Sequence, residues 1–409
     1  APVLVHAVTR KGYGYRPAEE DEADCLHGPG AFDAQTGKQL AAPSVKWTHI
    51  FAEELVAIAD ERPDVVGITA AMAEPTGIAA LARKYPKRVY DVGIAEQHAA
   101  TAAAGLALGG LHPVVAVYAT FLNRAFDQVL LDVALHKLPV TFVLDRAGVT
   151  GPDGPSHYGI WDLSVFGVVP GLRIAAPRDA ATLREELREA VSIDDGPTVL
   201  RFPTGAVNAD LPAVRRITAP GRSGPATGVD VLVESDRSDV LLVAVGAFGQ
   251  LGVDVASRVA EQGYGVTVVD PRWVRPIPEE LVTLAAAHRL VVTIEDGVRA
   301  GGVGDALAKA LRDADVWVPL RDLGLPLAWQ PHGTRAQILS DLRLTAQDVA
   351  LDITGWVSRL VEPAEPATVD GERRSTTAAV PSNGRRPTPA DQRADRVDRS
   401  LNGRPSRDR

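Results

Sequence analysis

The sequence contains very few cysteine and aromatic residues. Its 409 residues include one cysteine, Cys25, and aromatic residues make up 5% of the chain. A single cysteine excludes a disulfide within the chain, as is usual for proteins of a reducing compartment. The first residues, A-P-V-L-V-H, also lack the basic region and cleavage site of a secretory signal. We therefore expect a cytoplasmic protein.

Long apolar runs and an excess of positive charge in the main part of the chain are also missing. No stretch of 18 apolar residues occurs, so we expect no membrane-spanning segment and no membrane partner. The net charge is -9, although residues 371–409 contain ten arginines against five acidic residues. The rest of the chain is therefore acidic, and we expect no nucleic-acid partner. Residues 362–409 lack aromatic residues and are rich in Arg, Pro, Ser and Thr, which predicts a disordered basic tail.

Strands and helices alternate along most of the chain from Ser44 onward. The predicted strands are residues 65–69, 88–92, 114–118, 140–144 and 198–202, then 240–245, 265–269, 290–294 and 316–320. The predicted helices are residues 45–59, 95–108, 120–136 and 180–191, the last behind Asp179 as N-cap, then 249–262, 278–287, 302–312 and 346–359. This alternation predicts the α/β class, with two doubly wound, mostly parallel sheets. The Pro-, Gly- and Arg-rich residues 206–229 are the predicted linker between them. Residues 2–8 are a further predicted strand, whose sheet partners are not expected in this sequence.

The most informative segment is D-V-G-I-A-E-Q-H, residues 91–98. It places Glu96 in the first turn of a predicted helix that follows a predicted strand. In open α/β sheets, ligands gather outside the carboxyl ends of the strands. The alternative is a structural one, because a carboxylate in the first turn also complements the helix dipole by about 0.3 to 1 kcal/mol. The residues alone leave both interpretations open.

Further motifs occur in order along the chain. They are K-G-Y-G-Y at 11–15, H-G-P-G at 27–30, I-T-A-A-M at 68–72, Y-A-T-F-L-N-R-A-F-D-Q-V at 118–129, D-R-A-G-V-T-G-P-D-G-P-S-H-Y-G at 145–159, R-F-P-T-G at 201–205, D-P-R-W-V-R-P-I at 270–277, E-D-G-V-R-A-G-G-V-G at 295–304 and L-G-L-P at 323–326. Together with residues 91–98, this set resembles the 1-deoxy-D-xylulose-5-phosphate synthases, thiamine-diphosphate enzymes of the transketolase superfamily. The resemblance covers residues 1–361.

The resemblance implies a division of the chain into domains. Residues 1–43 would be the tail of a first α/β domain with its linker, 44–205 the pyrimidine-binding domain, and 230–361 the transketolase C-terminal domain. The family's magnesium and diphosphate ligands, a Gly-Asp-Gly motif and a later Asn, belong to the first domain and have no match here. We therefore assign no metal ligand and expect the Mg²⁺ ligands outside this sequence. The expected assembly is a homodimer, with a separate chain as another possible source of the first domain.

The resemblance also implies the residues that bind the cofactor, thiamine diphosphate. Glu96 would hydrogen-bond the aminopyrimidine ring, Ile94 would support the bent cofactor, and Phe121 would pack on the pyrimidine. The implied cofactor contacts also include Arg124, one helical turn after Phe121, and Lys11 and His27 from the first-domain tail. His98 would pack behind Glu96. The structural alternative for Ile94 and Phe121 is ordinary core packing.

A second group of residues is implied to bind the substrates. Tyr118, Arg146 and Arg201 would surround the phosphate of glyceraldehyde 3-phosphate, to which a guanidinium offers a planar fork of donors. Taken one at a time, each arginine is more often part of a surface ion pair. The sequence departs from the family at Phe202 and Thr204, where Tyr and a second Arg are usual. Asp153 and His157 would lie near the reacting carbons, and an imidazole can move protons near neutral pH.

The implied reaction is the decarboxylative condensation of pyruvate with glyceraldehyde 3-phosphate. It would give 1-deoxy-D-xylulose 5-phosphate and carbon dioxide, for isoprenoid, thiamine and pyridoxal precursors. We expect a transferase that is inactive without the first domain. Two alternatives stay open at this point. One is a β-type subunit of another transketolase or of a 2-oxoacid dehydrogenase, and the other is a non-catalytic remnant or binding module.

Overall fold

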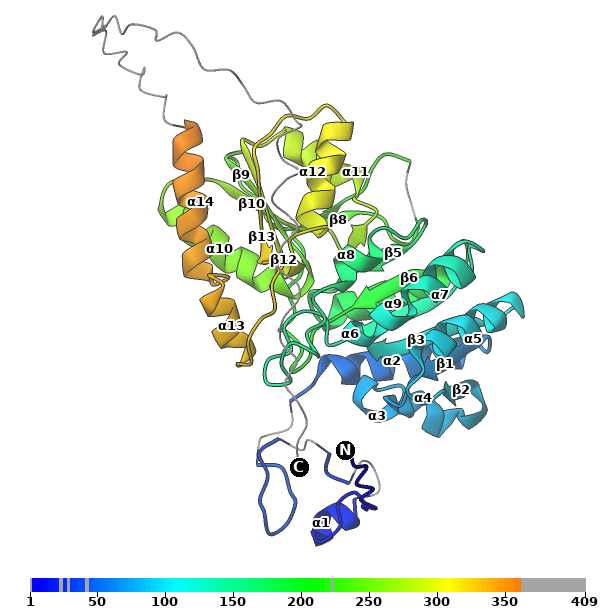
Figure 1. Ribbon diagram of the computed structural model, residues 1–409. Helices are drawn as coiled ribbons and strands as arrows, with labels where there is room; N and C mark the ends of the chain where they lie inside the picture. The colour runs from blue at the N-terminus through cyan, green and yellow to red at the C-terminus, as the bar shows by residue number, and fades with distance from the viewer. Residues whose placement is uncertain (1, 22–24, 28–29, 41–43, 222–223, 362–409) are drawn as a thin grey trace, which may run out of the picture. The chain divides into compact units, whose positions relative to one another are not determined.

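The computed structural model describes residues 2–21, 25–27, 30–40, 44–221 and 224–361 (Figure 1). The predicted tail at residues 362–409 lies outside these residues. The main helices are α1 (Arg16–Glu19), α2 (Trp47–Glu61), α3 (Ala73–Thr76), α4 (Ala79–Lys84), α5 (Glu96–Leu108), α6 (Ala119–Leu122), α7 (Phe126–Gln128), α8 (Asp162–Phe166), α9 (Ala180–Ser192), α10 (Gly249–Glu261), α11 (Glu279–Ala286), α12 (Val303–Asp313), α13 (Arg335–Asp341) and α14 (Ala346–Val361). None of the described helices is long and apolar enough to cross a bilayer.

The strands form two sheets, as the alternation predicts. Their bounds are β1 (Val65–Thr69), β2 (Val89–Asp91), β3 (His112–Tyr118), β4 (Thr141–Asp145), β5 (Arg173–Ala175), β6 (Thr198–Arg201), β7 (Arg215–Ile217), β8 (Val229–Val233), β9 (Val240–Ala244), β10 (Val266–Asp270), β11 (Trp273–Arg275), β12 (Leu290–Val298) and β13 (Leu320–Leu325). The first sheet has the order β11-β5-β6-β4-β3-β1-β2 and is parallel except for β11. The second has the order β13-β12-β9-β10-β8-β7. Its strands are parallel from β13 to β10, whereas β8 is antiparallel to β10 and β7 is antiparallel to β8. The predicted α/β class is confirmed.

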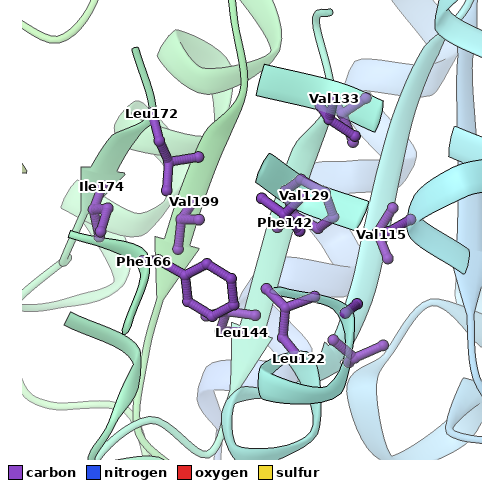
Figure 2. Packing of buried hydrophobic residues seen from close by; sticks show 14 of the residues in the cluster. Val115, Leu122, Val129, Val133, Phe142, Leu144, Phe166, Leu172, Ile174 and Val199 are labelled. Carbon is purple, nitrogen blue, oxygen red and sulfur yellow. The ribbon is translucent and has the colours of Figure 1, made fainter. Parts of the chain in front are cut away.

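The first sheet is buried on both faces. Successive side chains of a strand point to opposite faces, and Val115 and Phe142 belong to one core cluster while their neighbours Val114 and Val143 belong to the other. Figure 2 shows Phe142 and Val129, the first residue after α7, among the side chains of the first cluster. The second cluster packs against α2 and α9. This two-sided burial explains why the strands are almost continuous apolar runs rather than alternating ones.

The predicted helix over residues 120–136 is interrupted. The segment consists of α6, a 3₁₀ turn at Asn123–Ala125, the short α7 and a π-helical stretch at Val129–Ala134. No proline or glycine marks the break, so the sequence pattern alone does not reveal it. The hydroxyl of Thr101 in α5 donates a 2.6 Å hydrogen bond to Asp132 in the π-helical stretch. Stretches of this kind often occur at functional sites.

Several short elements differ from the prediction. The edge strand β7 lies inside the predicted linker and β8 begins at its end, where Arg216 donates to the carboxylate of Asp230 at 2.6 Å. The last predicted strand, residues 316–320, is displaced to β13. By contrast, Asp179 caps α9 as predicted, since its carboxylate accepts the backbone N–H of Thr182 at 2.8 Å.

The predicted strand at residues 2–8 is wrong. These residues form no strand, and their side chains are exposed. An apolar β-branched run becomes a strand only when another strand takes its backbone hydrogen bonds. No described residue pairs with this segment.

The two sheets are joined by buried charges and by β11. Nη1 of Arg178 donates to Asp230 and to Asp270, both at 2.8 Å, and all three side chains are buried. A buried arginine needs such partners, because an unpaired charge is costly in a protein interior. β11, which follows β10 of the second sheet in the chain, pairs antiparallel with β5 of the first. Residues from both sides of the linker therefore complete the first sheet.

A buried histidine makes the stability of this fold dependent on pH. Nε2 of His112, at the start of β3, lies 2.8 Å from the hydroxyl of Thr141, and burial lowers the pKa of His112 to about 4. Between about pH 6.5 and 4 the unfolded chain binds a proton that the native imidazole does not, so stability should fall as the pH falls through this window. The expected loss is about 3 kcal/mol, from about 1.4 kcal/mol for each pKa unit.

Urea unfolding of the wild type and His112→Gln from pH 7 to pH 4 tests this expectation. The glutamine cannot titrate, so the variant should lose less stability than the wild type over this range. Parallel curves for the two proteins would contradict it.

Candidate active site

The candidate site lies where four parallel strands end. β2, β1, β3 and β4 are neighbours, with Thr69 opposite Asp91 and Tyr118 opposite Asp145. Because the strands are parallel, their carboxyl ends share one edge of the sheet. The residues that follow these ends include Glu96 and Arg146, which the sequence analysis singled out. Ligands of open α/β sheets bind at such an edge.

Glu96 is the first residue of α5 and is buried, with 4% of its surface exposed. The turn before it is fixed by Asp91, whose carboxylate accepts the N–H of Ala71 at 2.8 Å and that of Gly93 at 3.0 Å. No hydrogen bond joins the Glu96 carboxylate to another described residue. Although only a small part of the residue is exposed, its carboxylate oxygens are not among the fully enclosed, unpartnered atoms of the described residues. The carboxylate is therefore unpaired and open to a ligand at the strand edge.

Ile94 is exposed, in contrast to the core packing that was its structural alternative. Its side chain is 88% exposed, two residues before the buried Glu96. A single exposed apolar side chain is ordinary on a protein surface. Here it adjoins an unpartnered carboxylate, so an apolar surface and a hydrogen-bonding group lie next to each other on the same turn.

Four of the predicted residues, from the end of β3, from α6 and from the segment after β4, form a cluster. The rings of Tyr118 and Phe121 stack at 5.6 Å, and the edge of the His157 ring meets Phe121 at 5.5 Å. The guanidinium of Arg146 lies 3.9 Å from the centre of the Tyr118 ring. Each side chain in this group limits the movement of the next. The cluster presents a cation, a phenol and an imidazole from one surface.

Arg146 is held in place by its backbone and by a carboxylate. Its φ of 62° is unusual for a residue other than glycine. Its Nη1 donates to the buried Asp145 at 2.7 Å. Burial raises the pKa of Asp145 to about 6, against the opposing effect of Arg146, and burial also raises the pKa of Tyr118 to about 12. The phenol of Tyr118 is thus a hydrogen-bond donor at neutral pH.

His157 lies on the loop after β4 together with Asp153. Nδ1 of His157 lies 3.0 Å from the hydroxyl of Ser156, and the hydroxyl of Thr120 donates to the carbonyl of Ser156 at 3.2 Å. Asp153 is exposed, and its charge is a minor cause of the raised pKa of Tyr118. The loop therefore brings both predicted residues to the Tyr118 cluster.

Arg201 occupies a different environment from the expected one. It is buried, its Nε donates to Asp162 at 2.6 Å, and its Nη2 donates to the carbonyl of Asp296 in β12 at 3.0 Å. Coulombic attraction and hydrogen bonding by Asp162 raise the pKa of Arg201 against the effect of its burial. The guanidinium is engaged in joining the two sheets, whereas that of Arg146 is partly exposed. Sequence reasoning could not separate the two arginines, because both lie at the carboxyl ends of strands of the same sheet.

The remaining predicted residues are all exposed. Lys11, His27 and Arg124 are exposed, and no contact joins Lys11 or Arg124 to Glu96 or Tyr118 in the described part of the chain. His98, expected to pack behind Glu96, is exposed instead. Two residues along an α-helix turn a side chain by about 200°, so His98 points away from the side on which Glu96 is buried. Among the described residues, no three His, Cys, Asp or Glu side chains are grouped to hold a metal ion.

Sequence reasoning missed three acidic residues around the site. Asp145 holds Arg146, Asp162 holds Arg201, and Asp296 of β12 reaches the loop after β4. Asp145 directly follows apolar residues of β4, and Asp296 follows Glu295 near the end of the largely apolar strand β12. A buried carboxylate needs a cation or hydrogen-bond donors nearby. The location of these two residues in apolar strands could therefore have indicated that each has such a partner.

Two family models match the two halves of this fold. The model described as "Transketolase, pyrimidine binding domain" matches residues 43–209, and "Transketolase, C-terminal domain" matches residues 230–349. The chain belongs to the transketolase superfamily. Among superfamily members, it is 58% identical over 380 residues to the 1-deoxy-D-xylulose-5-phosphate synthase of Saccharopolyspora erythraea and 60% identical over 358 residues to that of Leifsonia xyli. These matches cover 92% and 87% of this chain, but only 57% and 54% of the two relatives.

Solved transketolase structures share the fold. A split-gene transketolase described as an inactive beta4 tetramer is 28% identical and has a TM-score of 0.65, over 78% of this chain and 100% of that one. The transketolase of Campylobacter jejuni has a TM-score of 0.63 at 18% identity, over 77% of this chain and 48% of its own. The predicted membership of the superfamily is thus confirmed, and the chain spans little more than half the length of the curated relatives it matches.

The burial of Glu96 leads to a stability prediction. Glu96→Gln keeps the shape of the side chain and removes an unpartnered charge, at the loss of a favourable helix-dipole interaction. We expect the variant to be more stable than the wild type by about 1 kcal/mol, as is common when a functional residue is replaced. Urea unfolding at pH 7 measures the difference.

Glu53→Gln on α2 is the matched control, because Glu53 is exposed and its carboxylate forms an ion pair with Arg184. Its stability should change by less than about 0.5 kcal/mol. A loss of stability in Glu96→Gln larger than in this control would contradict the interpretation of Glu96 as a binding group.

Proposed function

We propose that this chain carries the pyrimidine-binding and acceptor-binding parts of a 1-deoxy-D-xylulose-5-phosphate synthase. The proposed reaction is the thiamine-diphosphate-dependent decarboxylative condensation of pyruvate with glyceraldehyde 3-phosphate. The observation that carries the proposal is the unpartnered carboxylate of the largely buried Glu96, at the strand edge that also bears the Tyr118 cluster. The relatives of this name support it, at 55 to 60% identity.

The residues present fit the pyrimidine end of thiamine diphosphate. Glu96 offers a carboxylate to a ring nitrogen, Ile94 offers an exposed apolar surface, and Phe121 offers a partly exposed aromatic face. The cofactor, when bound, supplies a carbon nucleophile and stabilises the charge left by decarboxylation. Glu96 would hold the aminopyrimidine ring in the tautomer that this chemistry requires.

The Tyr118 cluster fits the acceptor aldehyde and its phosphate. Arg146 is oriented by Asp145 and is the partly exposed guanidinium of the group, so we assign it the main phosphate contact. Tyr118 would donate a hydrogen bond to the same phosphate. His157 would deliver a proton to the aldehyde oxygen as it becomes an alcohol, with Asp153 nearby. Arg201 was expected to share the phosphate, and we now propose for it a role in joining the two sheets.

We further propose that the diphosphate and Mg²⁺ are bound by residues outside this sequence. The basis is the fit of the site, because the described residues include no group of three His, Cys, Asp or Glu side chains that could hold a metal ion. The missing ligands could come from the same polypeptide or from a second chain. A split-gene transketolase of similar fold, described as an inactive tetramer, supports the second arrangement. A homodimer and a cytoplasmic location, like the contributions of Lys11, His27 and Arg124, stay predictions.

Calorimetry and an activity assay test the proposed function. Thiamine diphosphate with Mg²⁺ is titrated into the protein alone and together with a first domain from a close relative, and each mixture is assayed with pyruvate and glyceraldehyde 3-phosphate. Turnover is expected only in the complemented mixture, and Glu96→Ala should reduce it at least a hundredfold, as for loss of a group that acts in the transition state. Glu53→Ala is the control. A complemented mixture without turnover would refute the enzyme function.

Arg146→Ala separates acceptor binding from cofactor binding. Loss of a charge-assisted contact worth about 1.5 to 3 kcal/mol should raise KM for glyceraldehyde 3-phosphate about tenfold to a hundredfold. KM for pyruvate and the affinity for thiamine diphosphate should change little. Steady-state kinetics with each substrate varied in turn measures the effect, and Arg184→Ala on α9 removes an exposed ion pair as the control. An equal rise for both substrates would show that Arg146 has another role.

A further inference from the structure

The loop that carries Asp153 and His157 is built into the core of the second sheet. Val149, Tyr158 and Ile160 are almost completely buried, and they belong to the hydrophobic cluster that also contains residues of β9, β12 and α14. The two ends of the loop therefore pack against the C-terminal domain. Between them the loop is rich in glycine and proline, so few of its own side chains can define its shape.

A carboxylate and a guanidinium of the second sheet bind the start of this loop. Oδ1 of Asp296 in β12 accepts the N–H of Val149 at 3.1 Å, and Nη1 of Arg335 in α13 donates to the carbonyl of Val149 at 2.9 Å. Asp296 and Arg335 also form an ion pair at 2.5 Å. The backbone N–H and carbonyl of Val149 are thus bound by the two members of one ion pair.

Gly148 allows this close approach. Its φ is +80°, and a Cβ at this position would lie 1.9 Å from Oδ2 of Asp296. Asp296 cannot simply move aside, because it is buried and paired with Arg335. Further along, the hydroxyl of Tyr158 lies 2.9 Å from the carbonyl of Gly151 and 2.8 Å from that of Pro331, so its single proton serves one or the other.

The opposite side of the same loop forms part of the candidate active site. Thr120, next to Phe121, binds the carbonyl of Ser156, and the ring of His157 meets Phe121. The loop therefore lies between the second sheet and the residues after β3. A displacement at Val149 would change where His157 lies relative to Tyr118.

We propose that Asp296 and Arg335 are positioning residues, through which the C-terminal domain fixes the loop that carries Asp153 and His157. The anchoring itself follows from the contacts of the loop, whereas its catalytic consequence rests on the proposed function. Neither residue touches the reacting groups in this arrangement. The C-terminal domain thereby helps to position the residues proposed to act on the acceptor aldehyde.

Hydrogen exchange on the chain as it stands tests the anchoring. In Asp296→Ala and Arg335→Ala, amides of residues 148–159 should exchange at least about tenfold faster than in the wild type, because each change removes a charge-assisted hydrogen bond. Asp296→Asn keeps an oxygen for the Val149 N–H and should restore part of the protection. Gly148→Ala leaves the ion-pair side chains intact and should loosen the same residues.

Arg343→Ala is the control, because it removes an arginine ion pair with Asp352 in the same domain without touching the loop. The proposal would be overturned if residues 148–159 exchanged within about twofold of the wild-type rate in Asp296→Ala, Arg335→Ala and Gly148→Ala alike. So would an increase spread equally over β9, β12 and α12, since that would mean general loosening of the domain.

Kinetics in the complemented mixture test the catalytic consequence separately. Asp296→Ala should raise KM for glyceraldehyde 3-phosphate and lower kcat, while the affinity for thiamine diphosphate measured by calorimetry stays the same. Unchanged kinetics with a loosened loop would overturn the catalytic part. Absence of turnover in the wild-type mixture would refute the proposed function, and the exchange experiment would still decide the anchoring.

Discussion

The parallel alignment of β2, β1, β3 and β4 is the constraint on which the candidate site depends. Parallel strands end at one edge of their sheet, so residues from distant motifs meet there without any contact between those motifs in the sequence. Asp91 and Asp145 stand at two of these ends and hold the turns that follow. The buried apolar strands fix the edge, and the polar residues of the turns give it its chemistry.

The charged residues fall into two groups with different tasks. Arg178 and Arg201 are buried with carboxylates and connect the sheets, and their geometry is complete without a ligand. Glu96 is buried without a partner, and Arg146 leaves part of its guanidinium open although Asp145 orients it. For an arginine, a buried and fully paired guanidinium indicates a structural role, and a partly open one is available for binding. This distinction, rather than residue type, separates Arg146 from Arg201.

The fold class and most of the longer helices and strands were predicted from the sequence, and the bounds of the first four strands were predicted to within two residues. These predictions succeeded because buried strands and amphipathic helices have strong periodic patterns. The break after α6 and the edge strand β7 were missed, since neither has a periodic pattern and both depend on tertiary contacts such as the pairing of Arg216 with Asp230. Glu96, Tyr118, Arg146 and His157 were predicted from their motifs, and they all follow or end strands at the same edge of the first sheet. The engagement of Arg201 by Asp162 could not be foreseen, because it requires knowing which side chains meet across the sheets.

The antiparallel strand β11 has a consequence for the independence of the two halves. It covers the outer edge of β5, although its residues follow the second sheet's β10 in the chain. A fragment cut in the segment between the two family matches would leave the backbone groups of β5 without their partner. Uncovered strand edges readily pair with other chains. The sheet of the pyrimidine-binding half is therefore completed only by a strand from the other half.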